Sequence, residues 1–551
     1  MRALVAVLIV LSLTGCASLP TSGPVRIGPD LSSTTGEETF YYSPSSPVEG
    51  ASQAEILSGF LAAGTGPQND YAVAREFLSE TIRSSWNPSQ EVLIQRSSPL
   101  VNISETDTAE VEVDVLAIVD ADGKYEAGIA DSKEVLEFDF ILENSEWRLS
   151  KAPDLTVLIK PVFDVVFSAY SIYFVDKQKR YLVPEVRWFP ATAATGTRLA
   201  NALLRGASSW LRPAVVSAIP SGTRLSIDAV TVENGIALVD LTARALVAAR
   251  TDRSLMKAQL DATLSQLPNV TEVAISIERS KQDIPEAQGL TQVVGPWPLA
   301  VLGEAGLESI STPESEVFQP GASFFESTTV SDFSLAAQSG WLAVVSDAGV
   351  IRTRSEQPGA LVEQLDSRPG ISAIEFDRQE YLWSTVRTRG ASIIATSTSG
   401  ESFTVAADWL AGQSIRDLAI SPEGSRAAVL IQGPGRTQVA VTAIVRDQSG
   451  KPLELTNPID IVPEVANPTS LSWVDEATVA VVNSTAEFTN TLLSTVGGTT
   501  RTISSLPGTV SLVSTGTVTQ LYLLTKGGEL FTYRGSSWSS LRKSVRAMSL
   551  Y

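Results

Sequence analysis

The fold of the C-terminal half is decided by a ten-residue stretch and the short apolar run behind it. The stretch reads Ile415-Arg416-Asp417-Leu418-Ala419-Ile420-Ser421-Pro422-Glu423-Gly424. Its beginning suits a β-strand, Ser421 to Gly424 form a polar turn, and the apolar run from Ala427 to Leu430 suits a second strand. The same order of strand, turn and strand recurs along the chain, so this stretch is one unit of a repeat.

The repeat predicts a β-propeller over residues 290–551. Equivalent strands are marked, at intervals of 39, 44, 53 and 41 residues, by Leu335, Ile374, Leu418, Leu471 and Leu512. A unit of two or more strands recurring about every 40–50 residues is typical of propeller blades. Five or six blades fit this length, and we predict six. The strand-like segment Val545–Tyr551 is expected to close the ring by pairing with the first blade.

An α+β domain is predicted over residues 48–157. Two amphipathic helices are marked by Ile56, Leu57, Phe60 and Leu61, and then by Tyr71, Ala74, Leu78 and Ile82. Two strands with alternating polar and apolar residues follow, near residues 110–115 and 136–142. Helices followed by an antiparallel sheet with one buried face suggest a domain similar to the NTF2-like domains.

An α/β domain is predicted over residues 160–282, in the order β-α-β-β-α-β. We expect strands at 171–175, 225–227, 236–239 and 273–277, and helices at 199–210 and 256–267. Pro213 would end the first helix. Asn234-Gly235 between apolar runs predicts a tight hairpin turn.

The N-terminus has the features of a bacterial lipoprotein signal. Leu13-Thr14-Gly15-Cys16 closes an apolar run that begins at Ala3, after the positive charge of Arg2. The run is too short to span a bilayer but fits a secretion signal. We predict cleavage of residues 1–15 between Gly15 and Cys16, with a diacylglyceryl group on the sulfur and a palmitoyl group on the amino group of Cys16. Residues 16–47, rich in Ser, Thr, Pro and Gly, would form a flexible tether. An uncleaved anchor with an incidental cysteine is less favoured, because Cys16 is the only cysteine.

Composition restricts the chemistry. The 551 residues carry a formal charge of −20 and include no histidine. Ser-His-Asp and Cys-His catalysis and histidine metal sites are therefore excluded. We predict no enzyme activity, no cofactor and no metal site. The acidic balance argues against nucleic-acid binding.

Three local patterns admit a functional interpretation and a plainer one. Asp120-Ala121-Asp122-Gly123 with Glu126 has the residue types of a calcium loop, but its flanks are strands and a hairpin turn is favoured. One face of the first sheet is acidic and would suit a basic partner, although a solvated face is favoured; it carries Glu110, Glu112, Asp114, Glu137 and Asp139. The aromatic residues Trp341, Trp383 and Trp473 are expected to pack between blades, with carbohydrate stacking as the alternative.

The order of these parts resembles the actinobacterial lipoprotein LpqB family. The resemblance covers essentially the whole chain, from the lipobox to the propeller. The second domain is similar to a GerMN domain in the runs 218–225 and 235–241, and the propeller in the run 415–424. The resemblance implies an accessory of a two-component system that contacts the extracellular domain of the sensor kinase MtrB and influences phosphorylation of MtrA. Cell division and envelope homeostasis would depend on it. It supplies no catalytic motif.

Two other function classes stay open at this point: a module that binds wall glycan, and a hydrolase that works with carboxylates. The absence of histidine weakens the hydrolase, and the whole-chain resemblance favours the accessory protein. We therefore predict a lipid-anchored protein at the extracytoplasmic face of the cell membrane, with a sensor kinase as its partner.

Overall fold

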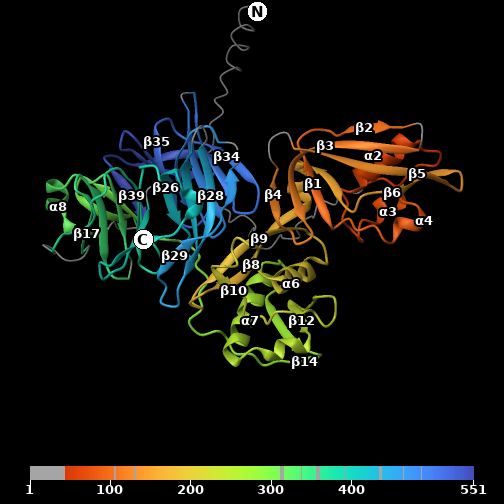
Figure 1. Cartoon of the computed structure of the whole chain (residues 1–551), viewed down its shortest axis with the longest axis horizontal. Coiled ribbons are helices and arrows are strands. Elements are labelled where there is room, and N and C mark those ends of the chain that lie inside the picture. The colour runs from red at the N-terminus through yellow and green to blue at the C-terminus, as the bar shows by residue number, and fades with distance from the viewer. Residues whose placement is uncertain are drawn as a thin grey trace, which may run out of the picture. The chain divides into compact units, whose positions relative to one another are not determined.

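The computed structural model describes most of the chain after the tether. It describes residues 44–104, 107–128, 132–310, 316–336, 338–354, 360–390, 392–433, 437–462, 465–485 and 487–551. Cys16, the lipobox and nearly all of the predicted tether lie outside the described residues. Figure 1 labels many of the helices and strands named below.

The N-terminal region packs three short helices against a twisted sheet. The helices are α2 (Gln53–Ala63), α3 (Ala72–Glu76) and α4 (Glu80–Arg83). The strands are β1 (Glu91–Gln95), β2 (Leu100–Ile103), β3 (Thr108–Asp120), β4 (Tyr125–Ala127), β5 (Lys133–Glu143), β6 (Glu146–Lys151) and β7 (Thr156–Ile159). The sheet order is β6-β5-β3-β1-β7, and β2 and β4 also pair with β3. Phe60 of α2 packs edge-on against Phe138 of β5, so the helices cover the apolar face of the sheet.

Local signals explain where these helices begin and end. Ser52 and Glu55 form a capping box at the start of α2. The second predicted helix is wrong in its extent, because it is interrupted between α3 and α4. There Leu78 forms a bridge with Leu149 of β6, and the Ser79 amide donates to the Leu149 carbonyl at 2.8 Å. Pairing with the sheet replaces the helical hydrogen bonds at this point. The predicted similarity to NTF2-like domains is not confirmed.

The middle region holds two small sheets and two main helices. Its helical elements are α5 (Lys160–Val166), α6 (Thr195–Arg205), η2 (Ala243–Val247) and α7 (Arg250–Leu264). Its strands are β8 (Phe167–Asp176), β9 (Leu182–Pro190), β10 (Val215–Val216), β11 (Thr231–Glu233), β12 (Ile236–Leu241), β13 (Glu272–Ile277) and β14 (Ser280–Lys281). The sheet orders are β10-β8-β9 and β11-β12-β13-β14. Because β12 and β13 are parallel, α7 forms the crossover between them.

Some predicted elements of this region are confirmed and others are wrong. Asn234 and Gly235 have φ angles of 52° and 83° and connect β11 to β12, as the hairpin prediction requires. The predicted strand at 225–227 is reduced to one bridge between Leu225 and Leu241. Helix α6 ends at Arg205, well before Pro213, because Gly206 leaves helical geometry with φ 90°. Strand β9 was not predicted, since its buried residues include charged ones.

The C-terminal region is a β-propeller. Blades 1 to 3 contain β15 (Leu299–Gly303), β16 (Gly306–Ile310) and β17 (Glu316–Gly321); β18 (Asp332–Leu335), β19 (Trp341–Ser346), β20 (Gly349–Arg354) and β21 (Glu363–Asp366); and β22 (Ile371–Phe376), β23 (Leu382–Val386), β24 (Ile393–Thr396) and β25 (Ser402–Val405). Short helices α8 (Ala322–Ser327) and η3 (Asp408–Leu410) lie between strands.

Blades 4 to 6 follow the same plan. They contain β26 (Ser414–Ile420), β27 (Arg426–Gln432), β28 (Thr437–Arg446), β29 (Pro452–Leu455) and β30 (Ile459–Val462); β31 (Pro468–Trp473), β32 (Thr478–Ser484), β33 (Thr489–Thr495) and β34 (Thr500–Ser504); and β35 (Thr509–Ser514), β36 (Leu521–Thr525), β37 (Leu530–Arg534) and β38 (Ser537–Arg542). The last strand, β39 (Ala547–Leu550), belongs to blade 1.

Six blades close into a ring in the part of the chain that the structure describes, which confirms the predicted fold class. Strand β39 pairs antiparallel with β15, so the last strand completes the first blade as predicted. The innermost strands contact one another around the ring in the order β18, β22, β26, β31, β35 and β39. The inner strand of each blade remains an edge of its sheet, but in the closed ring these edges are short and face the central channel.

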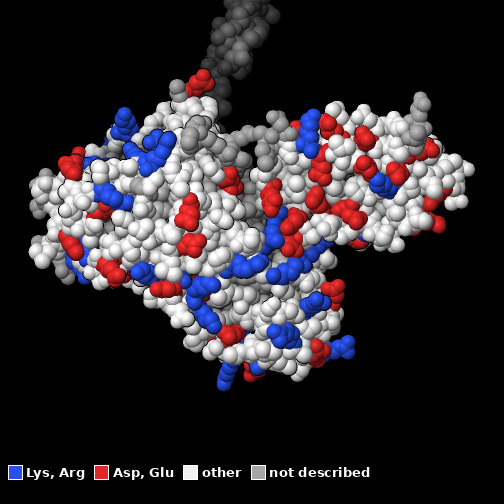
Figure 2. Space-filling model, viewed as in Figure 1, with Lys and Arg blue, Asp and Glu red and all other residues white. Residues whose placement is uncertain are grey.

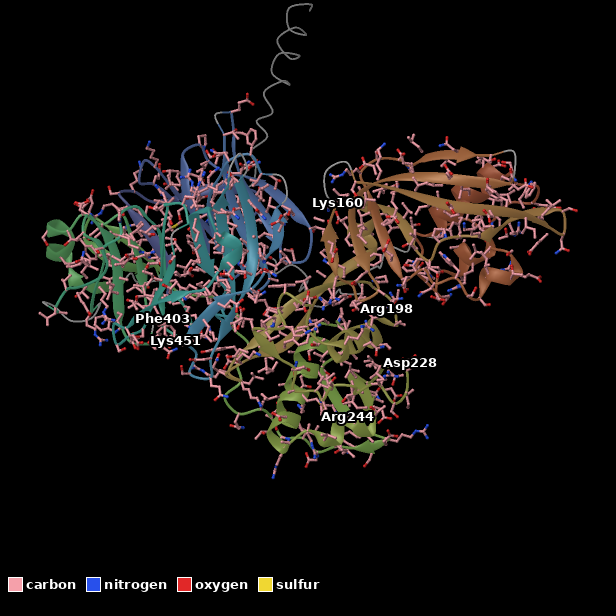
Figure 3. The ribbon with its side chains drawn as sticks, viewed as in Figure 1. Lys160, Arg198, Asp228, Arg244, Phe403 and Lys451 are labelled. Atoms are coloured by element: carbon pink, nitrogen blue, oxygen red, sulfur yellow. The ribbon has the colours of Figure 1, made fainter. Side chains whose placement is uncertain are left out.

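Neighbouring blades also meet away from the axis. Lys451, before β29 of blade 4, lies beside Phe403 of β25 in blade 3, with its Nζ atom 4.2 Å from the ring centroid (Figure 3). A single bridge joins Ala406 to Glu454 next to this pair. Outer strands therefore add contacts between blades to those made by the inner strands.

Candidate functional site in the propeller cavity

The propeller encloses a central cavity of about 520 Å³. Residues from the inner strand of every blade line it, together with Trp297 before β15. A volume of this size is within the range of small-ligand sites. The inner strands all run in the same direction along the axis, so the cavity has one end where they begin and another where they finish. We call the end where the inner strands begin the mouth.

Four successive inner strands carry an irregularity at the same place near the mouth. The pairing register of β22, β26, β31 and β35 shifts by one residue against the next strand of the blade. The extra residue of each shift, which we call the bulge ring, is Ser372, Arg416, Thr469 or Val510. All four line the cavity. A β-bulge redirects a side chain that regular pairing would fix to one face of the strand.

The other two blades make a related contact at this level. The Ser331 amide, just before β18, donates to the Val345 carbonyl at 3.0 Å. The Arg546 amide, just before β39, donates to the Leu302 carbonyl at 2.8 Å. Arg546 also lines the cavity. The mouth therefore receives one residue from each blade at a repeated position.

Three arginines, which we call the rim arginines, lie at the mouth: Arg387, Arg416 and Arg546. All three line the cavity and are exposed. None of them forms an ion pair with a carboxylate of the described residues. Among the described residues, their one side-chain hydrogen bond is long, 3.4 Å from Arg546 Nη2 to the Gly303 carbonyl. Other propeller arginines differ, since Arg426 and Arg446 are buried in ion pairs with Glu423 and Asp377.

Three carboxylates, the acid trio, lie deeper on the inner strands of blades 2 to 4: Asp332, Glu375 and Asp417. Glu375 Oε2 accepts from the Ile420 amide at 2.8 Å, and Asp417 Oδ2 accepts from the Leu471 amide at 2.9 Å. Each of these bonds joins one blade to the next. Burial raises the pKa of Asp332 to about 7, of Glu375 to about 8 and of Asp417 to about 7. Mutual repulsion within the trio acts in the same direction for Asp332 and Glu375.

These hydrogen bonds correct the predicted alignment of the repeats. Asp332 accepts from the amide of the next residue, Phe333, and Asp417 accepts from the amide of Leu418 in the same way, both at 2.9 Å. Phe333, rather than Leu335, is thus equivalent to Leu418. The sequence pattern missed the trio because the first repeat was aligned two residues too far along the chain. The available signal was an aspartate at the same position of two inner strands, Asp332 and Asp417, with Glu375 two residues further along the strand between them.

The acidic face of the N-terminal sheet forms as predicted, and lysines neutralise part of it. Glu110 of β3 lies opposite Glu137 of β5. Lys133 pairs with Glu112 at 2.6 Å, and Lys151 pairs with Glu137 at 2.7 Å. Asp114 lies 3.5 Å from Arg96, and Asp139 lies opposite Thr108. Figure 2 shows basic residues among the acidic ones on the visible face of this domain.

The segment with the residue types of a calcium loop is a turn. Asp120 Oδ1 accepts from the amides of Asp122 and Lys124, and the Gly123 amide donates to the Asp120 carbonyl at 2.9 Å. Asp122 pairs with Lys124 at 3.3 Å. These carboxylates are occupied in closing the β3–β4 hairpin. Among the described residues, no group of three acidic, His or Cys side chains is arranged to hold a metal ion.

The three blade tryptophans do not offer open faces for a sugar. Trp383 and Trp473 are buried, and their indole nitrogens donate to Asp377 and to the Ala419 carbonyl. Two guanidinium groups lie over Trp341, with the Cζ atoms of Arg352 and Arg354 at 4.0 and 3.8 Å from the ring centroid. Core packing, the favoured interpretation, is confirmed for the two buried rings.

Comparison with known families gives the same order of domains. The model for the N-terminal domain of lipoprotein LpqB matches residues 46–164, and the model for the LpqB β-propeller domain matches residues 317–548. Between them, a model described as sporulation and spore germination, Germane, matches residues 171–283. The chain belongs to the LpqB lipoprotein family. None of the three matched families is enzymatic.

Relatives named lipoprotein LpqB align over most of this chain. The one from Thermobifida fusca (strain YX) is 25% identical over 536 residues, covering 84% of each protein. The one from Cutibacterium acnes (strain DSM 16379 / KPA171202) is 25% identical over 477 residues, covering 80% of this chain and 78% of the relative. The match thus extends through all three domains of an LpqB protein.

Solved structures match single regions of the chain. The first GerMN domain of the sporulation protein GerM from Bacillus subtilis is 20% identical, with a TM-score of 0.18, and covers 21% of this chain and 89% of that one. The fold of the middle region is established by the strand pairing described above and not by this match. Within the described ranges, no helix has the length and hydropathy of a membrane span.

Proposed function

We propose that this LpqB-family protein is a lipid-anchored accessory protein that binds the extracellular domain of an MtrB-type sensor kinase and modulates its signalling. Cell division and envelope homeostasis would follow from that signalling. The observation that carries the proposal is the occurrence of both LpqB domains and the Germane domain, in order, along one chain. The MtrB partner itself comes from the family resemblance.

The composition and the described side chains support a binding role. The chain has no histidine, and its one cysteine is the proposed lipid-attachment residue. The cavity of the propeller holds carboxylates that are tied to neighbouring blades by hydrogen bonds to backbone amides. A closed propeller presents loops from all its blades at each end, a surface suited to contact with another protein.

We also propose that Cys16 anchors the protein at the extracytoplasmic face of the cell membrane. Restricting both proteins to one membrane raises their effective concentration without any added contact. A Cys16→Ala variant is expected in the soluble fraction after cell lysis. Firm membrane association of that variant would overturn the anchor.

Crosslinking in intact cells tests the partner. An affinity tag on the wild-type protein is expected to recover a sensor kinase, and the Cys16→Ala variant is expected to recover less of it. Purified kinase ectodomain should then bind the purified protein directly, as measured by biolayer interferometry. Recovery of wall fragments without a kinase would contradict the proposal and favour glycan binding.

A further inference from the structure

The mouth of the propeller cavity is a basic site in an acidic protein. The chain has 41 basic and 61 acidic residues. Five arginines of the described part of the propeller form ion pairs, for example Arg352 with Glu363 and Arg368 with Asp366. The rim arginines instead face the cavity without a carboxylate of the described residues in ion-pair distance. Three positive charges gathered at one opening create a local field opposite to that of the whole protein.

The bulge in β26 directs one of these charged side chains, Arg416, to the mouth. Arg416 is the extra residue of the bulge in β26, and the bulges of the three neighbouring blades place Ser372, Thr469 and Val510 at the same level. A bulge interrupts the strand pairing, so its repetition in four successive blades indicates a function for the redirected residues. The hydroxyl groups of two companions are engaged within their own blades: Ser372 is bonded to the Thr385 hydroxyl at 2.9 Å, and Thr469 donates to the Val482 carbonyl at 3.3 Å. Arg416 is therefore the charged member of the bulge ring that can meet an anion.

The positions of the rim arginines favour a ligand with more than one anionic group. Arg416 belongs to blade 4 and Arg546 precedes the inner strand of blade 1, so they lie on opposite sides of a six-bladed ring. Arg387 follows β23 of blade 3, and its amide donates to the Gly370 carbonyl at 2.9 Å beside the start of β22. Guanidinium groups that start on opposite sides of the opening can each pair with a separate carboxylate. A ligand with at least two anionic groups can therefore engage both sides at once.

We propose that the mouth of the propeller cavity binds a ligand with two or more carboxylates, held by the rim arginines. Planar guanidinium groups match carboxylates through paired hydrogen bonds. The proposal is independent of the kinase assignment, because it names the chemistry of the ligand and not its source. An acidic peptide segment and a free polycarboxylate share this chemistry, and the experiment separates them.

The groups below the mouth make this binding depend on pH. The acid trio faces the channel from β18, β22 and β26, and β31 and β35 contribute hydroxyl and apolar groups. Arg378, Asp377 and Glu380 lie at the far end. Because burial raises the pKa values of Asp332, Glu375 and Asp417 to about 7 or 8, the trio is largely neutral at pH 6 and largely ionised at pH 9. Affinity for an anion is therefore expected to fall as the pH rises over this range.

Calorimetric titration of the purified full-length protein tests the site. The probes are a hexaglutamate peptide, citrate and tripolyphosphate, at pH 6.5 and 0.15 M salt. Replacing one guanidinium, as Arg416→Gln or Arg546→Gln, is expected to weaken carboxylate binding by about tenfold, the size of one lost charged hydrogen-bond pair. The matched control is Arg501→Gln, since Arg501 is exposed on the outer strand β34 and does not line the cavity.

Each outcome decides the proposal. Binding of hexaglutamate alone supports an acidic peptide as the source, and binding of citrate as well supports a free polycarboxylate. Absence of binding by both carboxylate probes would overturn the proposal. The proposal would also be overturned if Arg501→Gln weakened carboxylate binding as much as the rim variants do, because binding would then depend only on the total charge of the protein. Stronger binding of tripolyphosphate than of hexaglutamate and citrate would overturn it as well. Thermal melting of each variant excludes loss of the fold as the cause.

The pH arm uses hexaglutamate, whose carboxylates stay ionised above pH 6. The affinity of the wild-type protein is expected to decrease from pH 6 to pH 9. An Asp332→Asn and Asp417→Asn double variant should show a smaller decrease, because amides do not ionise. An unchanged profile in this variant would remove the acid trio from the binding model.

Discussion

The charged residues of the N-terminal sheet and those of the propeller mouth differ in sign and in whether they are paired. On the sheet, acidic residues of β3 and β5 face solvent and two of them meet lysines across the strands, Glu112 with Lys133 and Glu137 with Lys151. At the mouth, the rim arginines have no such partners among the described residues, while three half-buried carboxylates line the cavity nearby. Solvated and paired charges need no ligand to explain them. The rim arginines are solvated too, but they are gathered at one opening without carboxylate partners among the described residues, and this arrangement is the reason for assigning them to a ligand.

The comparison also concerns what each carboxylate does for stability. Exposed ion pairs contribute little, because water screens both partners. Asp417 is different, since it accepts from the amides of Leu418 and Leu471 and so joins blades 4 and 5. The same residue type is therefore expected to be replaceable in the sheet and important in the propeller.

The largest effect is expected from Asp417→Ala. Two backbone amides would lose their acceptor, and each unsatisfied buried donor costs about 1–3 kcal/mol. We expect the free energy of unfolding to fall by roughly 3 kcal/mol, as measured by urea denaturation. Asp417→Asn keeps an acceptor oxygen and should cost clearly less. Equal losses for the two variants would show that the hydrogen bonds are not the cause.

A second effect is the dependence of propeller stability on pH. The folded pKa values of the acid trio, about 7 to 8, lie above the ordinary values for Asp and Glu in an unfolded chain. The folded state therefore holds protons that the unfolded state has released, and stability must fall as the pH rises. The trio's contribution is fully present below about pH 4 and is lost as the pH passes through 7 to 8. The melting temperature is expected to decrease from pH 6 to pH 9.

The control for this pH effect removes the ionisable groups. A variant with Asp332→Asn, Glu375→Gln and Asp417→Asn should have a flatter profile over the same range. If its melting temperature decreases as steeply as that of the wild-type protein, other groups cause the effect.

A smaller effect is expected from the rim. Arg416 is exposed and makes no ion pair with a described carboxylate, so Arg416→Gln should change the free energy of unfolding by less than about 0.5 kcal/mol. Urea denaturation without ligand is the measurement. A loss above 1 kcal/mol would show that Arg416 supports the fold and would weaken its assignment to binding.

The smallest effect is expected on the N-terminal sheet. Lys133→Ala breaks the exposed pair with Glu112, and the expected loss is below about 0.5 kcal/mol at 0.15 M salt. The difference from Asp417→Ala, measured by the same denaturation, sharpens the comparison. A loss of 2 kcal/mol or more would mean that the sheet depends on its paired charges after all.

The sequence predicted the parts of this molecule that depend on local periodicity. The alternation of Val111, Val113 and Val115 with acidic residues is enough to orient β3, and the spacing of strand pairs predicts a propeller of five or six blades, of which the structure has six. The pairing register could not be predicted in this way, because it depends on which residues of two strands lie opposite each other. The bulges were therefore not predicted, nor was the placement of Arg416 in the mouth.

The acid trio shows why the candidate site could not be predicted from local sequence patterns. Asp332, Glu375 and Asp417 are each more than forty residues from the next, and the packing of three adjacent blades brings them to one channel. The helix predicted from Tyr71 to Ile82 failed for a similar reason, since its interruption depends on Leu149 of a distant strand. In both cases a contact between remote segments overrides what the local pattern favours.

Strand β39 determines when the propeller ring can close during synthesis and folding of the chain. Blade 1 obtains its inner strand from residues 547–550, whereas its other strands begin at Leu299. The ring cannot close until this last strand has emerged, although five blades can already have formed. Closure then joins segments about 245 residues apart, and contacts of such long range are slow to form. An incomplete chain would expose the unpaired edge of β15, which is a template for pairing with another molecule.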